Sequence, residues 1–234
     1  MVEPALLQLQ LVNLDRKSPL RDQIYQLVRT LIIIGQLRPG QSVNEVEIAE
    51  QLGVSRTPVR EAVKRLSDEG LINVYAQTGT FVAKISRAAL EEAYVIRNAL
   101  EVESVRRAAA KITRLHVETL EDIIGQHQTA IARKRYADAI RLDDDFHRSI
   151  AEINDFSMLW RAVDISKAQM DRGRYLALPR PGSGETTIAQ HQAILTALAA
   201  HDEERAMEAM RVHLDTSLRN TLSLIGDILE PTAD

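Results

Sequence analysis

The sequence predicts a mostly α-helical protein in two parts: an N-terminal winged helix-turn-helix followed by an all-α antiparallel helical bundle. Before residue 86, helical periodicity is interrupted by turns at RPG (38–40) and LG (52–53). Two short β-prone runs, LINVY and TFVAKI, flank the turn AQTG. After residue 86, apolar residues recur at three-and-four spacing almost throughout. This change of pattern predicts domains at residues 1–84, including an N-terminal extension, and 85–234.

The segment VNEVEIAEQLGVSRTPVREAVKRLSDEG predicts two helices joined by a tight turn. Gly53 permits the sharp bend, because glycine adopts backbone conformations that other residues disfavour. Ser55 or Thr57 then caps the second helix, and Pro58 is tolerated in its first turn, where the amides have no internal partner. The buried side of this second helix is expected to hold Val59, Ala62, Val63 and Leu66.

The opposite side of the second helix is expected to face outward and to be polar. It holds Arg56, Thr57, Arg60, Glu61 and Lys64. A helix presented in this way fits the major groove of DNA, with its first residues at base edges and flanking cations at phosphates. The two β-prone runs would form a wing with Thr78, Gly79 and Thr80 at its tip. The alternative is a small packing module with a solvated, charged face.

The distribution of charge matters more here than its sum. The formal net charge of -4 by itself argues against a nucleic-acid-binding protein. The acidic excess, however, lies after residue 86. Within the first part, four cations crowd into one short segment opposed only by Glu61, and such local density attracts a phosphate backbone. These cations are Arg56, Arg60, Lys64 and Arg65.

GVSRTPVREAVKRLSDEGLI followed by TGTFVA, with LRPGQSVNEVEIAE upstream, resembles the winged helix-turn-helix signature of GntR-family bacterial regulators. The resemblance covers about residues 18–84 and implies binding of double-stranded operator DNA. It makes Arg56, Thr57 and Arg60 DNA contacts and places Lys64 and the wing tip, with Thr78 and Gly79, near the DNA backbone. Some members carry another contacting arginine where this chain has Val46, so neither that contact nor an operator sequence is carried over. A homodimer is expected, because two copies suit a two-fold operator.

The second part predicts a series of helices. Ser86 is expected to cap a long helix that continues to about Lys111, with apolar residues at helical spacing. Continuous helix is excluded at LPRPGSGE (178–185), which contains two prolines and two glycines. The remaining helices are expected at 114–134, 137–152, 157–177, 185–200 and 202–226.

Asp143 and His147 stand four residues apart and therefore share one face of their helix. His191 and His213 each have apolar neighbours at helical spacing and should also point into the bundle. Three neutral imidazoles and one carboxylate suit zinc, nickel or another borderline divalent cation, and suit calcium or magnesium poorly. Each histidine taken alone is more readily explained as a hydrogen-bonded core residue. The other histidines, His116, His127 and His201, are expected at the surface.

RLDDDFHRSI (141–150), together with HQAILTALAAHDEERAMEAMRVHL, resembles the FCD ligand-binding domain of one large, FadR-type GntR subfamily. The resemblance implies that four residues bind a divalent transition metal, zinc or nickel. These are Asp143, His147, His191 and His213.

Arg97, in YVIRNALE, is expected to turn inward from the first long helix, where a guanidinium can bind a carboxylate through two hydrogen bonds. It matches the FCD arginine associated with effector binding, and its alternative role is an ordinary salt bridge. Arg148 and Asn154 are weaker effector-binding candidates. Arg148 is also explained as a solvated side chain, and Asn154 as a helix C-cap.

The sequence therefore predicts a metal-containing bacterial transcription factor that binds operator DNA and is modulated by a small carboxylate effector. One alternative is a metal-ion sensor that needs no organic effector. A metalloenzyme fused to a DNA-binding domain is the less favoured alternative, because catalysis needs a positioned acid or base that the sequence does not single out. No enzymatic activity is therefore expected.

Cysteine is absent, which excludes disulfides and thiolate metal sites and fits a reducing compartment. The opening MVEPALLQLQLVNLDR lacks a basic stretch and a cleavage pattern, and no apolar run approaches the roughly 18 residues needed to cross a bilayer. We expect a cytoplasmic protein without a membrane partner.

Overall fold

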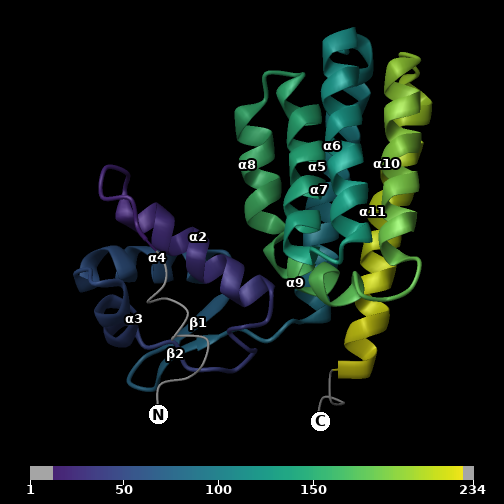
Figure 1. Ribbon diagram of the computed structural model, residues 1–234. Coiled ribbons are helices and arrows are strands. Elements are labelled where there is room, and N and C mark those ends of the chain that lie inside the picture. Colours follow the sequence, from purple (N-terminus) through teal and green to yellow (C-terminus); the bar gives the residue numbers. More distant parts are fainter. Residues whose placement is uncertain (1–12, 229–234) are drawn as a thin grey trace. The chain divides into compact units, whose positions relative to one another are not determined.

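The computed structural model describes residues 13–228, and the expected N-terminal extension lies largely outside this range. The chain divides into two compact units, Met1–Ile85 and Ser86–Asp234 (Figure 1). The predicted fold class is confirmed: a winged helix-turn-helix precedes an all-helical unit. Within the described range, no helix is both long enough and apolar enough to span a membrane.

The N-terminal unit packs three helices beside a small two-stranded sheet. In chain order these elements are α2 (Leu20–Ile33), α3 (Glu45–Leu52), α4 (Arg56–Asp68), β1 (Ile72–Tyr75) and β2 (Gly79–Val82). Ile24 of α2, Ile48 of α3, and Val59 and Leu66 of α4 are almost fully buried in the core of this unit. The apolar spacing in the sequence therefore identifies the faces through which these helices pack.

The turn between α3 and α4 has the geometry that its sequence predicts. Asn44 caps α3, because its side chain accepts hydrogen bonds from the backbone N–H groups of Val46 and Glu47. Gly53 ends α3 in the left-handed conformation, with φ of 62°. Ser55 is the N-cap residue of α4, although its side chain makes no capping hydrogen bond.

The two strands form the predicted wing. They pair antiparallel, with Ile72 opposite Val82 and Tyr75 opposite Gly79. The segment before α3 joins them through an isolated bridge between Ser42 and Phe81. The wing is thereby hydrogen-bonded to the chain that leads into the helix-turn-helix.

The C-terminal unit is a bundle in which successive long helices run in alternating directions (Figure 1). Its elements are α5 (Arg87–Lys111), α6 (Arg114–Ala132), α7 (Tyr136–Glu152), α8 (Ser157–Ser166), α9 (Ala168–Ala177), α10 (Ser183–Ala199) and α11 (Glu203–Ile228). Ser86 caps α5 as predicted, because its hydroxyl accepts a hydrogen bond from the backbone N–H of Ala89. A continuous core that includes Val105, Phe146, Leu198 and Leu214 joins α5, α7, α10 and α11.

One predicted helix is divided in the structure. The expected helix 157–177 consists of α8 and α9, which are separated at Lys167. The side chain of Lys167 is buried, and its ammonium lies 2.8 Å from a carboxylate oxygen of Asp144 and 2.5 Å from one of Asp171. Periodicity in the sequence could not reveal this junction, since the burial of Lys167 depends on a carboxylate from another helix.

Candidate metal centre and nucleic-acid interface

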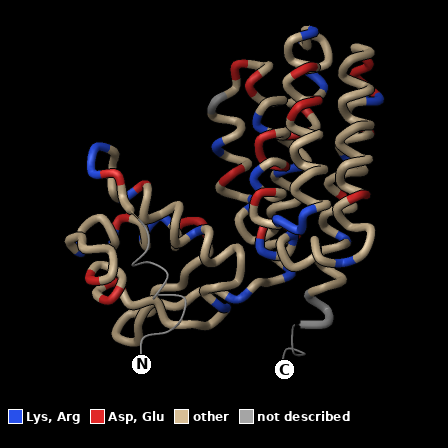
Figure 2. The backbone as a smooth tube through the Cα atoms, in the orientation of Figure 1, with Lys and Arg blue, Asp and Glu red and all other residues tan. Residues whose placement is uncertain are grey.

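The outward side of α4 carries the polar residues that the sequence predicts there. The side chains of Arg56, Thr57, Arg60 and Lys64 are all exposed. Helix α3 is acidic by contrast, and its acidic residues appear as red stretches in Figure 2. Nε of Arg60 lies 3.8 Å from Oε2 of Glu45 on α3, while the Arg60 side chain remains 70% exposed. The first turns of α4 can therefore present cations and a hydroxyl to a ligand outside the unit.

The tip of the wing is a tight turn between β1 and β2. Thr78 and Gly79 are exposed there. Gly79 has φ of 132°, a conformation that side chains disfavour, and a Cβ at this position would lie 3.4 Å from the Phe81 ring. Glycine therefore permits this backbone conformation at the wing tip.

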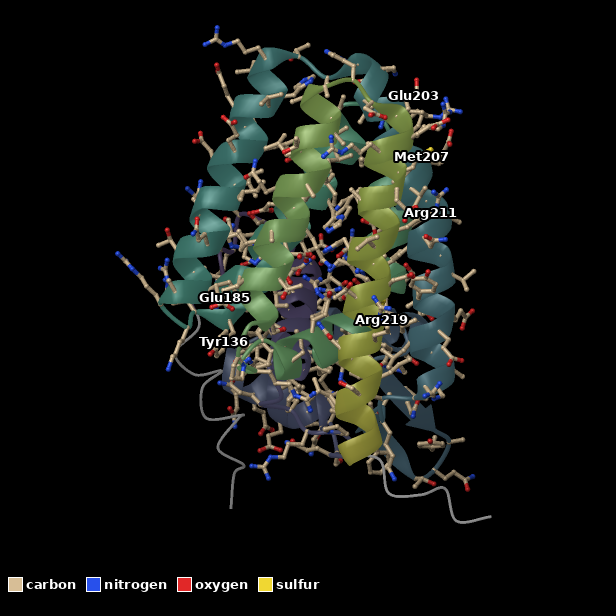
Figure 3. The ribbon with its side chains drawn as sticks, turned by 90° about the vertical axis from the view of Figure 1, so that its right-hand side faces the viewer. Tyr136, Glu185, Glu203, Met207, Arg211 and Arg219 are labelled. Atoms are coloured by element: carbon tan, nitrogen blue, oxygen red, sulfur yellow. The ribbon has the colours of Figure 1, made fainter. Side chains whose placement is uncertain are left out.

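The bundle brings together four residues that the sequence singled out. Asp143 and His147 come from α7, His191 from α10 and His213 from α11, and all four are buried. Each residue offers a ligand atom that lies within 4.8 Å of the others. Polar side-chain atoms gather between α10 and α11, at the height between Arg211 and Arg219 (Figure 3). Residues separated by as many as 70 positions thus converge on one point.

The distances within this cluster suit donor atoms around one ion. Nε2 of His147 lies 3.1 Å from Nε2 of His213 and 3.6 Å from Oδ2 of Asp143. Nε2 of His191 lies 3.3 Å from Oδ1 of Asp143. Adjacent donor atoms in a tetrahedral site with bonds of about 2.0–2.2 Å lie at about this separation from one another.

Two of the imidazoles are oriented by contacts to the ring nitrogen that faces away from the cluster. Nδ1 of His147 lies 2.5 Å from Oε2 of Glu101, which is itself paired with Arg97 at 2.5 Å. Nδ1 of His213 lies 3.2 Å from Oε1 of Gln190 and, as a donor, leaves its Nε2 lone pair facing the cluster. Carboxylate and amide oxygens that hold the far nitrogen of an imidazole are typical of metal sites, because they fix the ring and its tautomer.

Burial and neighbouring charge set the protonation states. Burial and the nearby imidazoles lower the pKa of His213 well below its ordinary value, and burial lowers the pKa of His191. Burial of Asp143 favours its neutral form, but the Arg174 guanidinium and the adjacent imidazoles outweigh it and hold the pKa of that carboxyl well below its usual range. Neutral imidazoles and an ionised carboxylate are the forms that bind metal ions.

The residues present fit a divalent transition metal. Three imidazoles and one carboxylate form the donor set, all four residues are buried, and neither ring nitrogen of His191 has a hydrogen-bond partner among the described residues. Buried polar atoms without partners are rare, because desolvation is costly. A cation bound at Nε2 of His191 would satisfy the ring nitrogen that faces the cluster.

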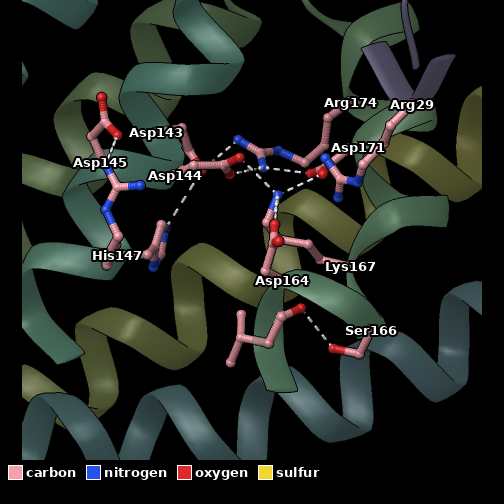
Figure 4. Close-up of polar contacts among 12 residues, drawn as sticks. Arg29, Asp143, Asp144, Asp145, His147, Asp164, Ser166, Lys167, Asp171 and Arg174 are labelled. Carbon is pink, nitrogen blue, oxygen red and sulfur yellow. Dashed lines mark hydrogen bonds and ion pairs between the residues drawn. The ribbon is translucent and has the colours of Figure 1, made fainter. Parts of the chain in front are cut away.

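Sequence reasoning missed the charged residues that surround Asp143. Nη2 of Arg174, on α9, lies 2.5 Å from Oδ2 of Asp143, and Nη1 lies 3.3 Å from Oδ1 of Asp171 (Figure 4). Asp144 in turn pairs with Lys167 at 2.8 Å. No spacing rule connects α7 with α9, although the density of charged residues in KAQMDRGR could have marked α9 as an unusual helix.

The prediction that His127 lies at the surface is wrong. The His127 side chain is 1% exposed, and its ring centroid lies 5.5 Å from that of His191. Burial lowers the pKa of His127 to about 4. Its apolar neighbours at helical spacing, Leu120, Ile124 and Ile131, are the signal that could have placed it inside.

The three residues considered for effector binding occupy different surroundings. Arg97 is buried, and its Nη1 has no hydrogen-bond partner among the described residues. Arg148 is half-exposed and pairs with Asp145. Asn154 is buried, and its Nδ2 donates a hydrogen bond to the carbonyl oxygen of Ser104 at 2.9 Å. Of the three, only Arg97 is linked to the metal cluster: it pairs with Glu101, which in turn contacts His147.

Comparison with known families divides the chain in the same way. Residues 20–82 match the family described as bacterial regulatory proteins, gntR family. Residues 92–216, more than half of the chain, match the FCD domain.

Individual proteins agree with these matches. The HTH-type transcriptional repressor RspR of Escherichia coli K12 is 36% identical over 202 residues, which cover 86% of this chain and 89% of that protein. The probable D-xylose utilization operon transcriptional repressor of Paenarthrobacter nicotinovorans is 30% identical over 215 residues, 91% of this chain and 93% of that protein. Among solved structures, E. coli McbR/YncC shares the fold with a TM-score of 0.78 at 23% identity, covering 89% of this chain and 99% of that one. The chain therefore belongs to the GntR family of bacterial regulators and is a transcriptional regulator, not an enzyme, with a DNA-binding helix-turn-helix and an FCD domain.

Proposed function

We propose that this regulator holds a divalent transition metal in its C-terminal unit and that a small organic acid bound beside the metal changes its affinity for operator DNA. The observation that carries the proposal is the buried cluster of Asp143, His147, His191 and His213, whose ligand atoms lie within 4.8 Å of one another. The histidine-rich donor set favours zinc or nickel.

The surrounding residues prepare the cluster for this role. Glu101 holds Nδ1 of His147, and Gln190 holds Nδ1 of His213, so that both Nε2 atoms face inward. When bound, the cation would supply positive charge and, by expanding beyond its four protein ligands, a position for a carboxylate. Arg97 adds a second positive charge behind Glu101, with an Nη1 that has no described partner. This combination favours an anionic ligand.

The same proposal assigns DNA contacts to the N-terminal unit. Arg56, Thr57 and Arg60 would meet base edges, while Lys64 and the wing tip would lie near phosphates. Their exposure on one face of α4 supports these roles. A homodimer would present two recognition helices to a two-fold operator.

An operator titration tests the proposal. Duplexes selected from a random pool would be titrated at fixed salt with chelated protein, zinc-loaded protein, and zinc-loaded protein with a panel of small carboxylates. We expect operator affinity to change when both zinc and an effective acid are present. A response to zinc alone would identify a metal-ion sensor, and equal affinity in every condition would refute ligand control.

A further inference from the structure

A buried carboxylate lies where α4 ends. Glu69 is the C-cap residue of α4, and its side chain is only 2% exposed. Gly70 follows in the left-handed conformation, and the N–H of Leu71 donates to the carbonyl oxygen of Leu66 at 2.9 Å, which closes the helix. The carboxyl end of a helix disfavours negative charge, and burial of a carboxylate is costly. Groups from elsewhere must therefore hold Glu69 in this position.

Helix α2 supplies a hydrogen-bond donor and a cation for Glu69. The hydroxyl of Tyr25 donates to the carboxylate, with its oxygen 2.7 Å from Oε1 and 2.9 Å from Oε2. Nε of Arg29, one turn further along α2, lies 3.5 Å from Oε2. Tyr25 is 1% exposed, and burial together with the hydrogen bond to Glu69 raises the pKa of its hydroxyl, which therefore stays protonated as a donor. A contact between residues 44 positions apart thus ties the end of α4 to α2.

Arg65, on α4 itself, contacts the same group. Its guanidinium carbon lies 3.6 Å from the centroid of the Tyr25 ring, a cation–π contact, and its Nε lies 3.6 Å from Oε1 of Glu69. Nη1 of Arg65 lies 3.6 Å from Oδ1 of Asp22, which is also on α2. Four residues therefore join the two helices, and we call them the α2–α4 clamp: Tyr25, Arg29, Arg65 and Glu69.

The orientation of Arg65 separates it from the other cations of α4. An α-helix turns about 100° per residue, so Arg65 lies about 140° around the helix from Arg60 and about 100° from Lys64. The Arg60 side chain is 70% exposed, whereas that of Arg65 is 43% exposed and contacts α2. The charge of Arg65 is therefore engaged inside the N-terminal unit, although the sequence groups it with cations that attract a phosphate backbone.

The clamp adds directional contacts to an apolar interface. Helices α2 and α4 pack against each other through buried apolar side chains, and the hydrophobic effect that holds them is non-directional. Hydrogen bonds and guanidinium contacts have a defined geometry, so those of the clamp limit the rotation and tilt of α4 against α2. A base edge accepts a side chain only within hydrogen-bond distance. A small tilt of α4 would therefore misplace Arg56 and Thr57 in the major groove.

We propose that Glu69 and Tyr25 are positioning residues for DNA recognition, which fix the tilt of α4 through the clamp, and that Arg65 acts in the clamp rather than on a phosphate. The inference rests on the proposed role of α4 as the recognition helix and is independent of the metal site. The side chains of Tyr25 and Glu69 are buried, so they act through α4 and not by direct contact with DNA.

Tyr25→Phe tests the clamp without changing any charge. The variant keeps the ring that Arg65 contacts and removes only the hydroxyl that donates to Glu69. Fluorescence anisotropy would measure affinity for a duplex selected from a random pool and for an unselected duplex of equal length. We expect affinity for the selected duplex to fall roughly three- to tenfold. Affinity for the unselected duplex should stay at its wild-type value, because the phosphate contacts are unchanged. Wild-type affinity for the selected duplex, or an equal loss on both duplexes, would overturn the proposal.

Two substitutions of Arg65 distinguish a clamp residue from a phosphate contact. Arg65→Lys keeps the charge but loses the planar group whose Nε contacts Glu69, and Arg65→Met loses both. For a clamp residue, both variants should weaken binding to the selected duplex roughly three- to tenfold, with the salt dependence unchanged. Wild-type affinity in Arg65→Lys would identify a phosphate contact instead. So would a slope of log binding constant against log salt concentration that falls by about one in Arg65→Met.

Ile33→Val controls for a general loss of stability. Ile33 is buried in the last turn of α2, away from the clamp, and the loss of one buried methyl group weakens packing without touching Tyr25 or Glu69. With folding verified by circular dichroism, this variant should bind both duplexes like wild type. A loss equal to that of Tyr25→Phe would show that reduced stability explains the effect and would refute the positioning role.

Arg60→Ala separates this inference from the proposed role of α4. If Arg60→Ala weakens binding to the selected duplex and Tyr25→Phe does not, only the clamp is refuted. If both variants bind that duplex like wild type, the assignment of α4 as the recognition helix fails as well.

Discussion

Nε2 of His147 lies 3.1 Å from Nε2 of His213, although 66 positions separate the two residues in the chain. Glu101 and Gln190 hold the opposite nitrogens of these two rings, so both Nε2 atoms face the same point. Two imidazoles that each donate through Nδ1 present their Nε2 lone pairs to each other, an arrangement that a shared cation stabilises. The first predictions concern this pair and the residues around it.

Replacement of cluster residues should remove the metal. Protein prepared with zinc or nickel should contain about one ion per chain, and Asp143→Ala and His213→Ala should each lose it after dialysis, because each change removes one of the four donors. Elemental analysis by mass spectrometry measures the content. His201→Ala, at an exposed histidine, serves as the control and should keep its metal. Full occupancy in both cluster variants would exclude this ligand set.

Glu101→Gln should weaken zinc binding by about 10- to 100-fold, the usual effect of changing the group that orients a metal-binding histidine. The change removes the negative charge beside Nδ1 of His147 and leaves the buried Arg97 without its counter-ion. Competition with a chelator gives the affinity. Glu103→Gln lies on the same helix at an exposed ion pair, and its zinc affinity should equal that of wild type. A similar loss in both variants would argue against the orienting role.

Arg60→Ala should weaken operator binding by about 1–3 kcal/mol if the side chain contacts a base edge. Lys64→Ala should instead reduce the dependence of affinity on salt. The slope of log binding constant against log salt concentration should fall by about one, as expected for the loss of one phosphate contact. Fluorescence anisotropy at several salt concentrations distinguishes the two effects. Arg114→Ala removes an exposed cation from the C-terminal unit and should leave both quantities unchanged. Operator affinity retained by Arg60→Ala would contradict its assignment.

Metal-free protein should lose stability as the pH falls below the ordinary histidine pKa of 6.5. His127, His191 and His213 all have lowered pKa values because they are buried, so the unfolded chain binds more protons than the folded chain in this range. His127, whose pKa is about 4, alone contributes on the order of 3 kcal/mol between pH 7 and pH 4. The carboxyls of Asp143 and Glu101 also have lowered pKa values, and their contribution is lost only at lower pH.

Urea unfolding at pH 7.5 and pH 5, with chelator present, measures this dependence. His116→Gln changes a histidine outside the buried group and should leave the pH dependence of the unfolding free energy unchanged. Equal unfolding free energies at the two pH values would contradict neutral burial of the three imidazoles.

Gly173→Ala should destabilise the C-terminal unit by about 1–3 kcal/mol, because the added Cβ would lie 2.1 Å from Cγ2 of Thr221. Gly125→Ala offers a matched control in another helix, where a Cβ meets no atom within 4 Å. That change should stabilise the protein by about 0.5–1 kcal/mol through helix propensity. Thermal unfolding compares the two variants. Equal effects would show that α9 can move away from α11 without cost.

The sequence was most informative where spacing alone determines geometry. The four-residue step from Asp143 to His147 placed both on one helix face, and the glycine at position 53 marked the turn of the helix-turn-helix. Arg174 and Lys167 could not be found in this way, because the carboxylates beside them come partly from α7, and the approach of two helices is not encoded in the periodicity of either. His127 was predictable in principle from its apolar neighbours.

The cluster takes one or two residues from each of α7, α10 and α11, and α11 ends the described chain. During synthesis, Asp143, His147 and His191 emerge before His213. The complete set of donors therefore forms only after α11 has packed against the other helices. A ribosome-bound or truncated chain that lacks α11 would bind the ion weakly. Metal binding would thus require a fully assembled bundle. Nascent or damaged copies of the protein would then bind no metal and would not respond to it.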